Sequence, residues 1–107
     1  MATYQVDEEN FQERIEEAFN TNKKVVLKFE SEFCDACMAQ GFELEELEEL
    51  RDDVDILEID CSESEQLAEH YNINQVPTMM IFKDKETLLY DEEGVILASD
   101  IEEILNS

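Results

Sequence analysis

The chain has 107 residues, of which 43% are hydrophobic and 35% are charged. This length suffices for one ordinary domain with a hydrophobic core, and the composition indicates a globular protein rather than a disordered one. The formal net charge of −23 would repel nucleic acid and anionic membrane surfaces, so we expect neither as a partner. A solvated acidic surface is the simplest explanation of this charge; adaptation to high salt and attraction of a basic partner are the alternatives.

No apolar stretch approaches the length that a membrane-spanning helix needs, and the first seven residues lack the basic and apolar regions of a signal peptide. Three cysteines leave one unpaired within the chain, which argues against a disulfide-stapled secreted scaffold. We therefore expect a cytoplasmic monomer that folds as a single domain over residues 1–107.

Periodic apolar patterns predict strands that alternate with helices along the chain. In chain order we expect an edge strand (3–6), a helix (7–19), a strand (25–29) and a long helix (35–50). A strand (55–60), a short helix (62–71), a two-stranded hairpin (78–82 and 87–90) and a final helix (99–105) follow. Such alternation implies right-handed crossovers and a parallel part of the sheet, and the hairpin adds an antiparallel edge. The predicted fold is a three-layer α/β/α arrangement with a mixed central sheet.

The long helix over residues 35–50 has a carboxylate-rich outer surface and a glycine, Gly41, which is expected to be its weak point or kink. Its apolar residues predict the face that packs on the core. The residues expected on that inner face are Met38, Phe42, Leu47 and Leu50.

Cys34 and Cys37 stand two residues apart, after the strand over residues 25–29 and at the start of the long helix. A Cys-x-x-Cys pair by itself serves zinc sites as well as redox dithiols. At a helix start, unpaired backbone N–H groups face the first sulfur and favour its thiolate, which points to redox chemistry. The carboxyl ends of parallel strands are also where such sheets place their binding sites.

The chain resembles the thioredoxin family in more than this pair. The order of predicted elements agrees, and Phe33 stands where the family has an aromatic residue before its dithiol. Residues 73–78, Ile-Asn-Gln-Val-Pro-Thr, are similar to the family segment that contains a cis-proline. The resemblance implies a thioredoxin fold and a thiol–disulfide oxidoreductase that reduces disulfide-containing proteins without a bound cofactor. Its electrons would come from a thioredoxin-reductase-like protein or a small thiol.

The same resemblance implies roles for individual residues. Cys34 would attack a substrate disulfide as a thiolate, and Cys37, one helical turn deeper, would resolve the mixed disulfide. Beside a cis Pro77, the Val76 backbone would pair with an extended substrate strand; the alternative is a proline that merely starts a strand. The remaining substrate-binding residues would be Phe33, Asp35, Ala36 and Thr78.

Several positions depart from the family pattern. Asp35 and Ala36 replace the usual Gly-Pro between the cysteines, and the chain has no tryptophan. A carboxylate at position 35, with Glu30 and Glu32 nearby, disfavours the Cys34 thiolate. We therefore expect a reducing or near-neutral couple that attacks sluggishly at neutral pH.

Lys28 stands where the family often has a buried aspartate, in an otherwise apolar strand face where an unpaired charge is costly. Glu58 on the following strand is the natural partner. We expect a semi-buried Lys28–Glu58 ion pair beneath Cys37, with Glu58 or a water as a proton relay. The alternative is a Lys28 ammonium that reaches solvent and takes no part in the chemistry.

The sequence leaves two alternatives to a disulfide reductase, a zinc site and a binding module. Cys34, Cys37, Cys61 and His70 are suitable zinc ligands by type, but the last two are not spaced as a zinc knuckle requires, so we expect no metal. Cys61 is expected to be an inert buried thiol. The second alternative is a thioredoxin-fold binding or redox-sensing module with poor general turnover and a dedicated basic partner.

Overall fold

The computed structural model describes residues 2–107 and contains the elements that the sequence predicts, in the predicted order. The strands are β1 (Ala2–Val6), β2 (Lys24–Glu30), β3 (Val54–Asp60), β4 (Thr78–Asp84) and β5 (Thr87–Glu93). The helices are α1 (Phe11–Asn20), α2 (Asp35–Leu50), α3 (Glu65–His70) and α4 (Ala98–Leu105).

The strands form one mixed sheet in the order β1-β3-β2-β4-β5. β1, β3 and β2 run parallel, whereas β4 pairs antiparallel with β2, and β5 pairs antiparallel with β4. Parallel neighbours need crossover connections, which α1 and α2 supply between β1, β2 and β3. The expected combination of a parallel part and an antiparallel edge is confirmed.

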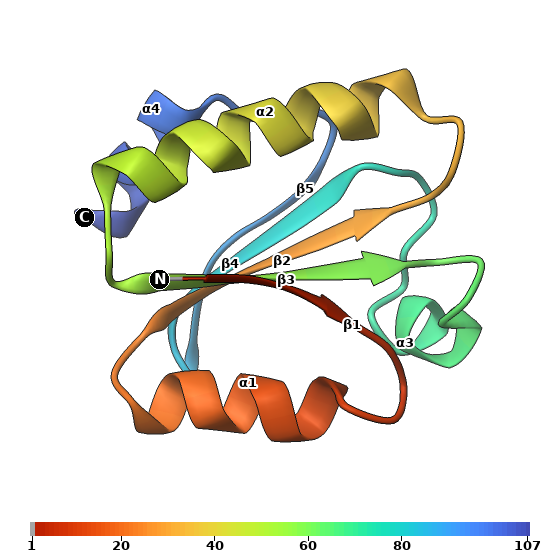
Figure 1. Ribbon diagram of the computed structural model, residues 1–107, viewed down its shortest axis with the longest axis horizontal. Coiled ribbons are helices and arrows are strands. Elements are labelled where there is room, and N and C mark those ends of the chain that lie inside the picture. The colour runs from red at the N-terminus through yellow and green to blue at the C-terminus, as the bar shows by residue number, and fades with distance from the viewer. Residues whose placement is uncertain (1) are drawn as a thin grey trace.

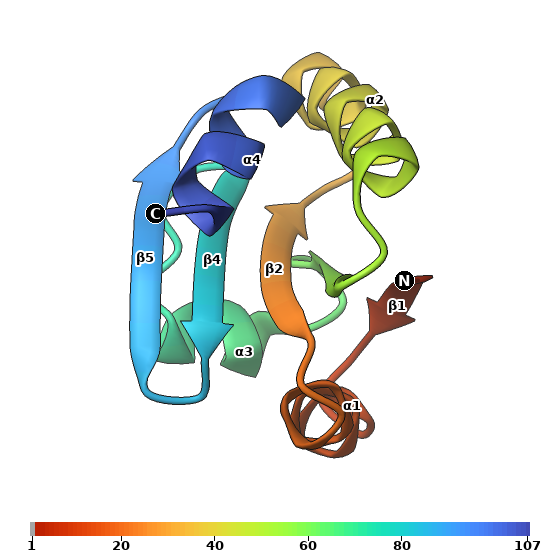
Figure 2. The same ribbon diagram turned by 90° about the vertical axis from the view of Figure 1, so that its left-hand side faces the viewer.

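Helices cover both faces of the sheet, with α2 and α4 on one face and α1 and α3 on the other (Figure 1, Figure 2). Successive side chains of a strand point to opposite faces. On β2, Val26 therefore packs into the hydrophobic cluster under α2 and α4, while Val25 and Leu27 pack into the cluster over α1. Because both of its faces are covered, β2 needs an almost continuous apolar sequence.

Helix α2 has the bounds that the sequence predicts but a different inner face. Its buried residues are Cys37, Gln40, Leu44 and Leu47. The prediction is right for Leu47 and wrong for three other residues: Met38, Phe42 and Leu50 are 65%, 62% and 53% exposed. The error arises because a cysteine and a glutamine, rather than larger apolar residues, define the stripe that faces the sheet.

Helix α1 starts at Phe11 rather than at the predicted Asp7. The Asp7 carboxylate accepts hydrogen bonds from the backbone N–H groups of Glu9 at 2.9 Å and Asn10 at 3.1 Å. Asp7 therefore organises the turn that precedes the helix, a role that aspartate fills readily because its short side chain reaches backbone groups two or three residues ahead.

The longest helix of the described residues, α2, has 16 residues and carries carboxylates on its outer surface. Within residues 2–107, no helix combines the length and the apolar character needed to cross a membrane.

Candidate active site

Cys34 and Cys37 lie at the N-terminus of α2 and are joined as a disulfide, with their Cα atoms 5.2 Å apart. Cys34 is the N-cap residue, and its Sγ accepts a hydrogen bond from the Cys37 backbone N–H at 3.1 Å. The Cys34 residue is partly exposed, whereas Cys37 is only 4% exposed. The start of the helix thus places one sulfur within reach of another molecule and encloses the other.

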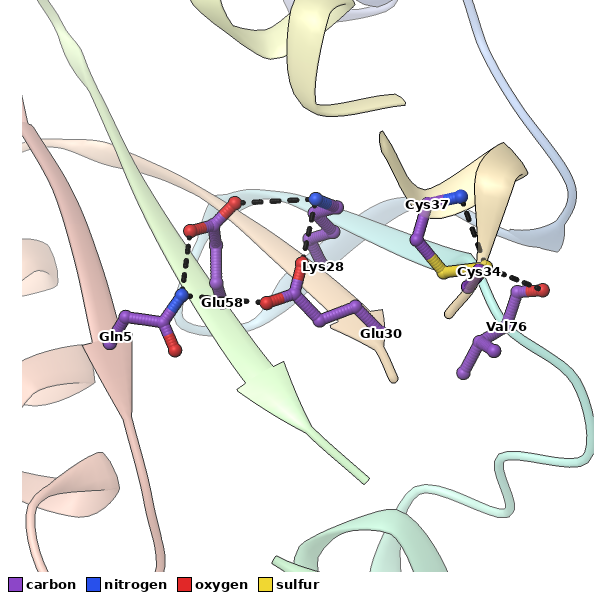
Figure 3. A network of polar contacts seen from close by, with 7 residues as sticks. All are labelled: Gln5, Lys28, Glu30, Cys34, Cys37, Glu58 and Val76. Atoms are coloured by element: carbon purple, nitrogen blue, oxygen red, sulfur yellow. Dashed lines mark hydrogen bonds and ion pairs between the residues drawn. A yellow bond between two sulfur atoms is a disulfide. The ribbon is translucent and has the colours of Figure 1, made fainter. Parts of the chain in front are cut away.

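The loop before β4 lies against the dithiol. The Val76–Pro77 peptide bond is cis, and the Val76 carbonyl oxygen lies 4.0 Å from Cys34 Sγ (Figure 3). Pro77 is buried and Val76 is partly exposed. Thr78 is buried as well, and its hydroxyl donates to the Gln75 carbonyl at 2.6 Å, so Thr78 shapes this loop from inside.

A hollow of about 460 Å³ opens beside the two sulfurs. Four carboxylates and two apolar side chains contribute to its lining: Glu30, Glu32, Asp35, Asp60, Phe33 and Met38. The Phe33 ring is fully exposed, on a residue whose φ of 55° is rare for a bulky side chain. Asp35 and Ala36 are exposed in the first turn of α2. The entrance to the dithiol is therefore both acidic and apolar.

Lys28 is buried on β2, and its ammonium lies between two carboxylates (Figure 3). Nζ is 2.7 Å from Glu30 Oε1 and 3.4 Å from Glu58 Oε2. Gln5 Nε2 donates to Glu58 at 3.0 Å and to Glu30 at 3.4 Å. We call these four residues the ionic network. The strand register sets it, because Glu58 of β3 lies opposite Gln5 of β1 and opposite Lys28 of β2.

The expected contact between Lys28 and Glu58 is present, but Glu30 is the nearer carboxylate. The alternative of an ammonium that reaches solvent is excluded by its 4% exposure. The sequence contained a signal for Glu30, since residues 28 and 30 of one strand point to the same face of the sheet.

Gly41 of α2 lies over the Lys28 ammonium. A Cβ atom at position 41 would stand 3.4 Å from Lys28 Nζ. The helix is continuous through this residue. A Cβ at that distance makes an ordinary contact, so the fold does not require glycine here, and the helix runs on through the residue where the sequence predicts a weak point or kink.

Gln40 is a buried polar residue near the dithiol that the sequence does not predict. It is fully buried one turn after Cys37, and its amide forms two hydrogen bonds with the Ile96 backbone. Its spacing offers a signal, because a residue three positions after the inward Cys37 lies on the same face of the helix. The apolar residues at positions 38 and 42 obscured it, because they suggest a different inner face.

Cys61 is a free thiol that directly follows β3. Burial raises the pKa of this thiol, and the negative charge of Asp60 raises it further. A thiol in such surroundings is a weak nucleophile at neutral pH. In the described residues, His, Cys, Asp and Glu side chains nowhere form a group of three or more that could hold a metal ion.

The model of the Thioredoxin family matches residues 2–107. The chain belongs to the thioredoxin family. Similar curated proteins include the thioredoxin of Mycoplasmoides gallisepticum, which is 27% identical over 92 residues, covering 85% of this chain and 90% of that protein. The thioredoxin of Chlamydia trachomatis is 33% identical over 79 residues, covering 74% of this chain and 72% of that protein.

Solved thioredoxin structures share the fold. Chloroplastic thioredoxin z superposes with a TM-score of 0.85 at 25% identity, covering 99% of this chain and 93% of that one. The short form of spinach chloroplast thioredoxin f gives a TM-score of 0.81 at 27% identity, covering 97% and 90%. The thioredoxin fold is confirmed, and with its dithiol the chain is a thiol–disulfide oxidoreductase.

Proposed function

We propose that this thioredoxin-family protein reduces disulfides of other proteins through Cys34 and Cys37, as a cytoplasmic monomer with a single domain over residues 1–107. The observation that carries the proposal is the unequal placement of the two sulfurs. Cys34 is accessible beside the Val76 carbonyl, and Cys37 is enclosed behind it. The dithiol carries the two electrons itself, so no bound cofactor is required. A thioredoxin-reductase-like protein or a small thiol would restore the reduced form.

The reaction consists of two exchange steps. The Cys34 thiolate, favoured by the Cys37 N–H and the helix start, attacks one substrate sulfur. The substrate S–S bond breaks, a mixed disulfide forms, and the released sulfur takes a proton. Cys37 then loses its proton and attacks Cys34 Sγ, which releases the second substrate thiol. The Cys34–Cys37 disulfide in the structure corresponds to the oxidised enzyme that results.

The Val76 backbone is the element that would hold the substrate. An extended segment paired with it brings a neighbouring disulfide to Cys34, because the Val76 oxygen lies 4.0 Å from that sulfur. Phe33 and Asp35 line the hollow beside the two sulfurs, and Ala36 is exposed next to them.

The ionic network supports a role in the second step. Cys37 and Lys28 line the same hollow, and Lys28 Nζ lies 3.4 Å from the Glu58 carboxylate behind it. Glu58, or a water bound to it, would accept the Cys37 proton while Lys28 holds the carboxylates in place. Turnover of Glu58→Gln and Lys28→Met variants tests this role. We expect slower release of product from the mixed disulfide in both, and unchanged rates would remove the relay.

The proposed function is tested by reduction of insulin disulfides with dithiothreitol as the electron source. We expect turnover with the wild type, none above background with Cys34→Ser, and an unchanged rate with Cys61→Ser as the matched cysteine control. Background rates for both the wild type and Cys34→Ser would refute the proposed reduction of protein disulfides.

A dedicated basic partner is the second candidate function, and the outer face of α2 favours it. Phe33, just before this helix, and Met38 and Phe42 on it are exposed. Apart from Glu43, whose carboxylate accepts from the Ala98 N–H, the helix carries five carboxylates and no basic residue: Asp35, Glu45, Glu46, Glu48 and Glu49. Exposed apolar groups within an anionic surface suit a cationic, partly apolar polypeptide.

Two disulfide peptides of equal length, one flanked by lysines and one by glutamates, test that preference. We expect faster reduction of the lysine peptide, by a factor that shrinks between about 0.02 M and about 0.5 M salt because ions screen the attraction. Equal rates for both peptides at low salt would contradict a basic partner and leave the general reductase intact.

A further inference from the structure

Gln40 connects helix α2 to the segment between β5 and α4. Its side chain has no exposed surface and lies on the inner face of α2, one turn after Cys37. Nε2 donates to the Ile96 carbonyl at 2.9 Å, and Oε1 accepts from the Ile96 N–H at 2.8 Å. One side-chain amide thus satisfies both backbone groups of a buried residue that belongs to no strand or helix.

The same segment is attached at its other end to the cis-proline loop. The Gly94 N–H donates to the Pro77 carbonyl at 2.8 Å. Gly94 has a φ of 94°, which residues with a side chain rarely adopt. Because Gly94 and Ile96 are only two residues apart, a displacement of one is passed to the other.

These contacts close a circuit around the dithiol. It runs from Cys37 along α2 to Gln40, across to Ile96, back along the chain to Gly94, and over to Pro77. The circuit is completed by the 4.0 Å contact between the Val76 carbonyl and Cys34 Sγ, which Figure 3 shows.

We propose that Gln40 is a positioning residue that sets the separation between the dithiol and the Val76–Pro77 loop. The inference rests on the proposed function, because this separation matters only when a substrate held by Val76 is attacked by Cys34. Reacting atoms must approach to about 3–3.5 Å, and a misplacement of about 1 Å can reduce a rate by about a hundredfold. The two hydrogen bonds between Gln40 and Ile96, which we call the clamp, supply that precision because they link the helix of the dithiol to the segment that holds the Val76–Pro77 loop.

The test compares Gln40→Leu with Glu43→Ala. Leucine keeps an apolar side chain in the buried space but leaves both Ile96 backbone groups without their partner. Glu43 is the matched control, since its Oε1 accepts from the Ala98 N–H at 2.9 Å and so ties the same segment to the same helix, away from Gly94. Each variant is assayed on insulin, whose chain can pair with Val76, and on bis(2-hydroxyethyl) disulfide, which has no backbone to pair.

For Gln40→Leu we expect kcat/KM on insulin to fall about tenfold, mainly through KM, and the rate on the small disulfide to stay within about twofold. For Glu43→Ala we expect a lower melting temperature with an unchanged ratio of the two rates. A ratio that Gln40→Leu shifts no more than Glu43→Ala overturns the positioning role. A wild type that reduces neither substrate overturns the proposed function instead, so the two failures are distinguishable.

Amide hydrogen exchange of the wild-type protein tests the clamp without any variant, should Gln40→Leu fail to fold. We expect the Ile96 amide to exchange as slowly as the Gly94 amide, because opening of either requires the same circuit to open. An Ile96 amide that exchanges much faster than that of Gly94 would contradict the clamp.

Discussion

Two polar groups lie beneath helix α2, and they differ in charge and in burial. Gln40 has no exposed surface, whereas in the ionic network only Lys28 is buried, Glu30 and Glu58 are partly exposed and Gln5 is exposed. The ionic network joins Lys28 to Glu30 and Glu58, with Gln5 as a neutral member. The clamp of Gln40 on Ile96 is neutral and complete within one pair of residues. In the network, the Lys28 charge and the two carboxylate charges stabilise one another. In the clamp, uncharged groups form hydrogen bonds that depend only on distance and angle. Loss of one member therefore has different consequences in the two groups.

A buried charge that loses its partner keeps the desolvation penalty and gains repulsion from any like charge nearby. Loss of the buried Gln40 amide leaves uncharged backbone groups without partners, and each such group lowers the free energy of unfolding by about 1–3 kcal/mol. We expect the network to govern stability and its dependence on charge, and the clamp to govern the geometry of the dithiol.

Replacement of Lys28 by methionine is expected to have the largest effect. It leaves the Glu30 and Glu58 carboxylates on one face of the sheet without their cation, so we expect the free energy of unfolding to fall by about 3 kcal/mol. Urea denaturation at neutral pH measures it. The control is Lys24→Met on the same strand, which removes a more exposed pair with Asp53 at 3.3 Å and should lose under about 1 kcal/mol. Equal losses would show that burial of the network does not matter.

The two carboxylates of the network are expected to contribute unequally. Glu30→Gln removes the negative charge 2.7 Å from Lys28 Nζ and should lower the free energy of unfolding by about 1–2 kcal/mol. Glu58→Gln removes the charge at 3.4 Å and should lower it by less than about 1 kcal/mol. Double-mutant cycles with Lys28→Met separate the two pairs. A larger coupling energy between Lys28 and Glu58 than between Lys28 and Glu30 would contradict the prediction that the nearer carboxylate is the stronger partner.

Replacement of Gly41 by alanine is expected to stabilise the protein by about 0.5–1 kcal/mol. Alanine favours a helix interior over glycine, and the new Cβ would meet Lys28 Nζ at 3.4 Å, an ordinary contact with the flexible end of a side chain. Thermal denaturation measures the change, with Ala39→Gly on the exposed side of α2 as the reverse control. A loss of stability in Gly41→Ala would mean that the buried ammonium has no room to adjust.

The partly exposed pair of Arg51 and Asp53 provides the smallest expected effect. Hydrogen bonds from Arg51, followed by one from Lys24, hold the pKa of Asp53 well below its usual range. The Asp53 side chain is 38% exposed, so solvent screening limits its contribution to about 0.5 kcal/mol.

Because the folded-state pKa of Asp53 is lowered, its contribution is complete above the unfolded pKa of about 3.9 and is lost as the pH falls below it. We therefore expect Asp53→Asn to be slightly less stable than the wild type at pH 7 and to match it near the acid end of the titration. A difference that persists in acid would come from something other than this carboxylate charge.

Local patterns along the sequence predict those structural features that residues close together in the chain determine. The order of strands and helices, the mixed sheet, and the position of Cys34 and Cys37 at a strand-to-helix junction follow from periodicity and spacing, and all are confirmed. The resemblance carried by this pair and by residues 73–78 also identified the family correctly.

Tertiary packing alone decided the inner face of α2 and the partners of its buried polar residues. Met38 and Phe42 are as apolar as any core residue, yet Cys37 and Gln40 face the sheet, because the helix is oriented by its contacts rather than by its own composition. Gln40 of this helix binds Ile96 from 56 positions away. Such contacts depend on how distant segments meet in space, which the local pattern does not encode.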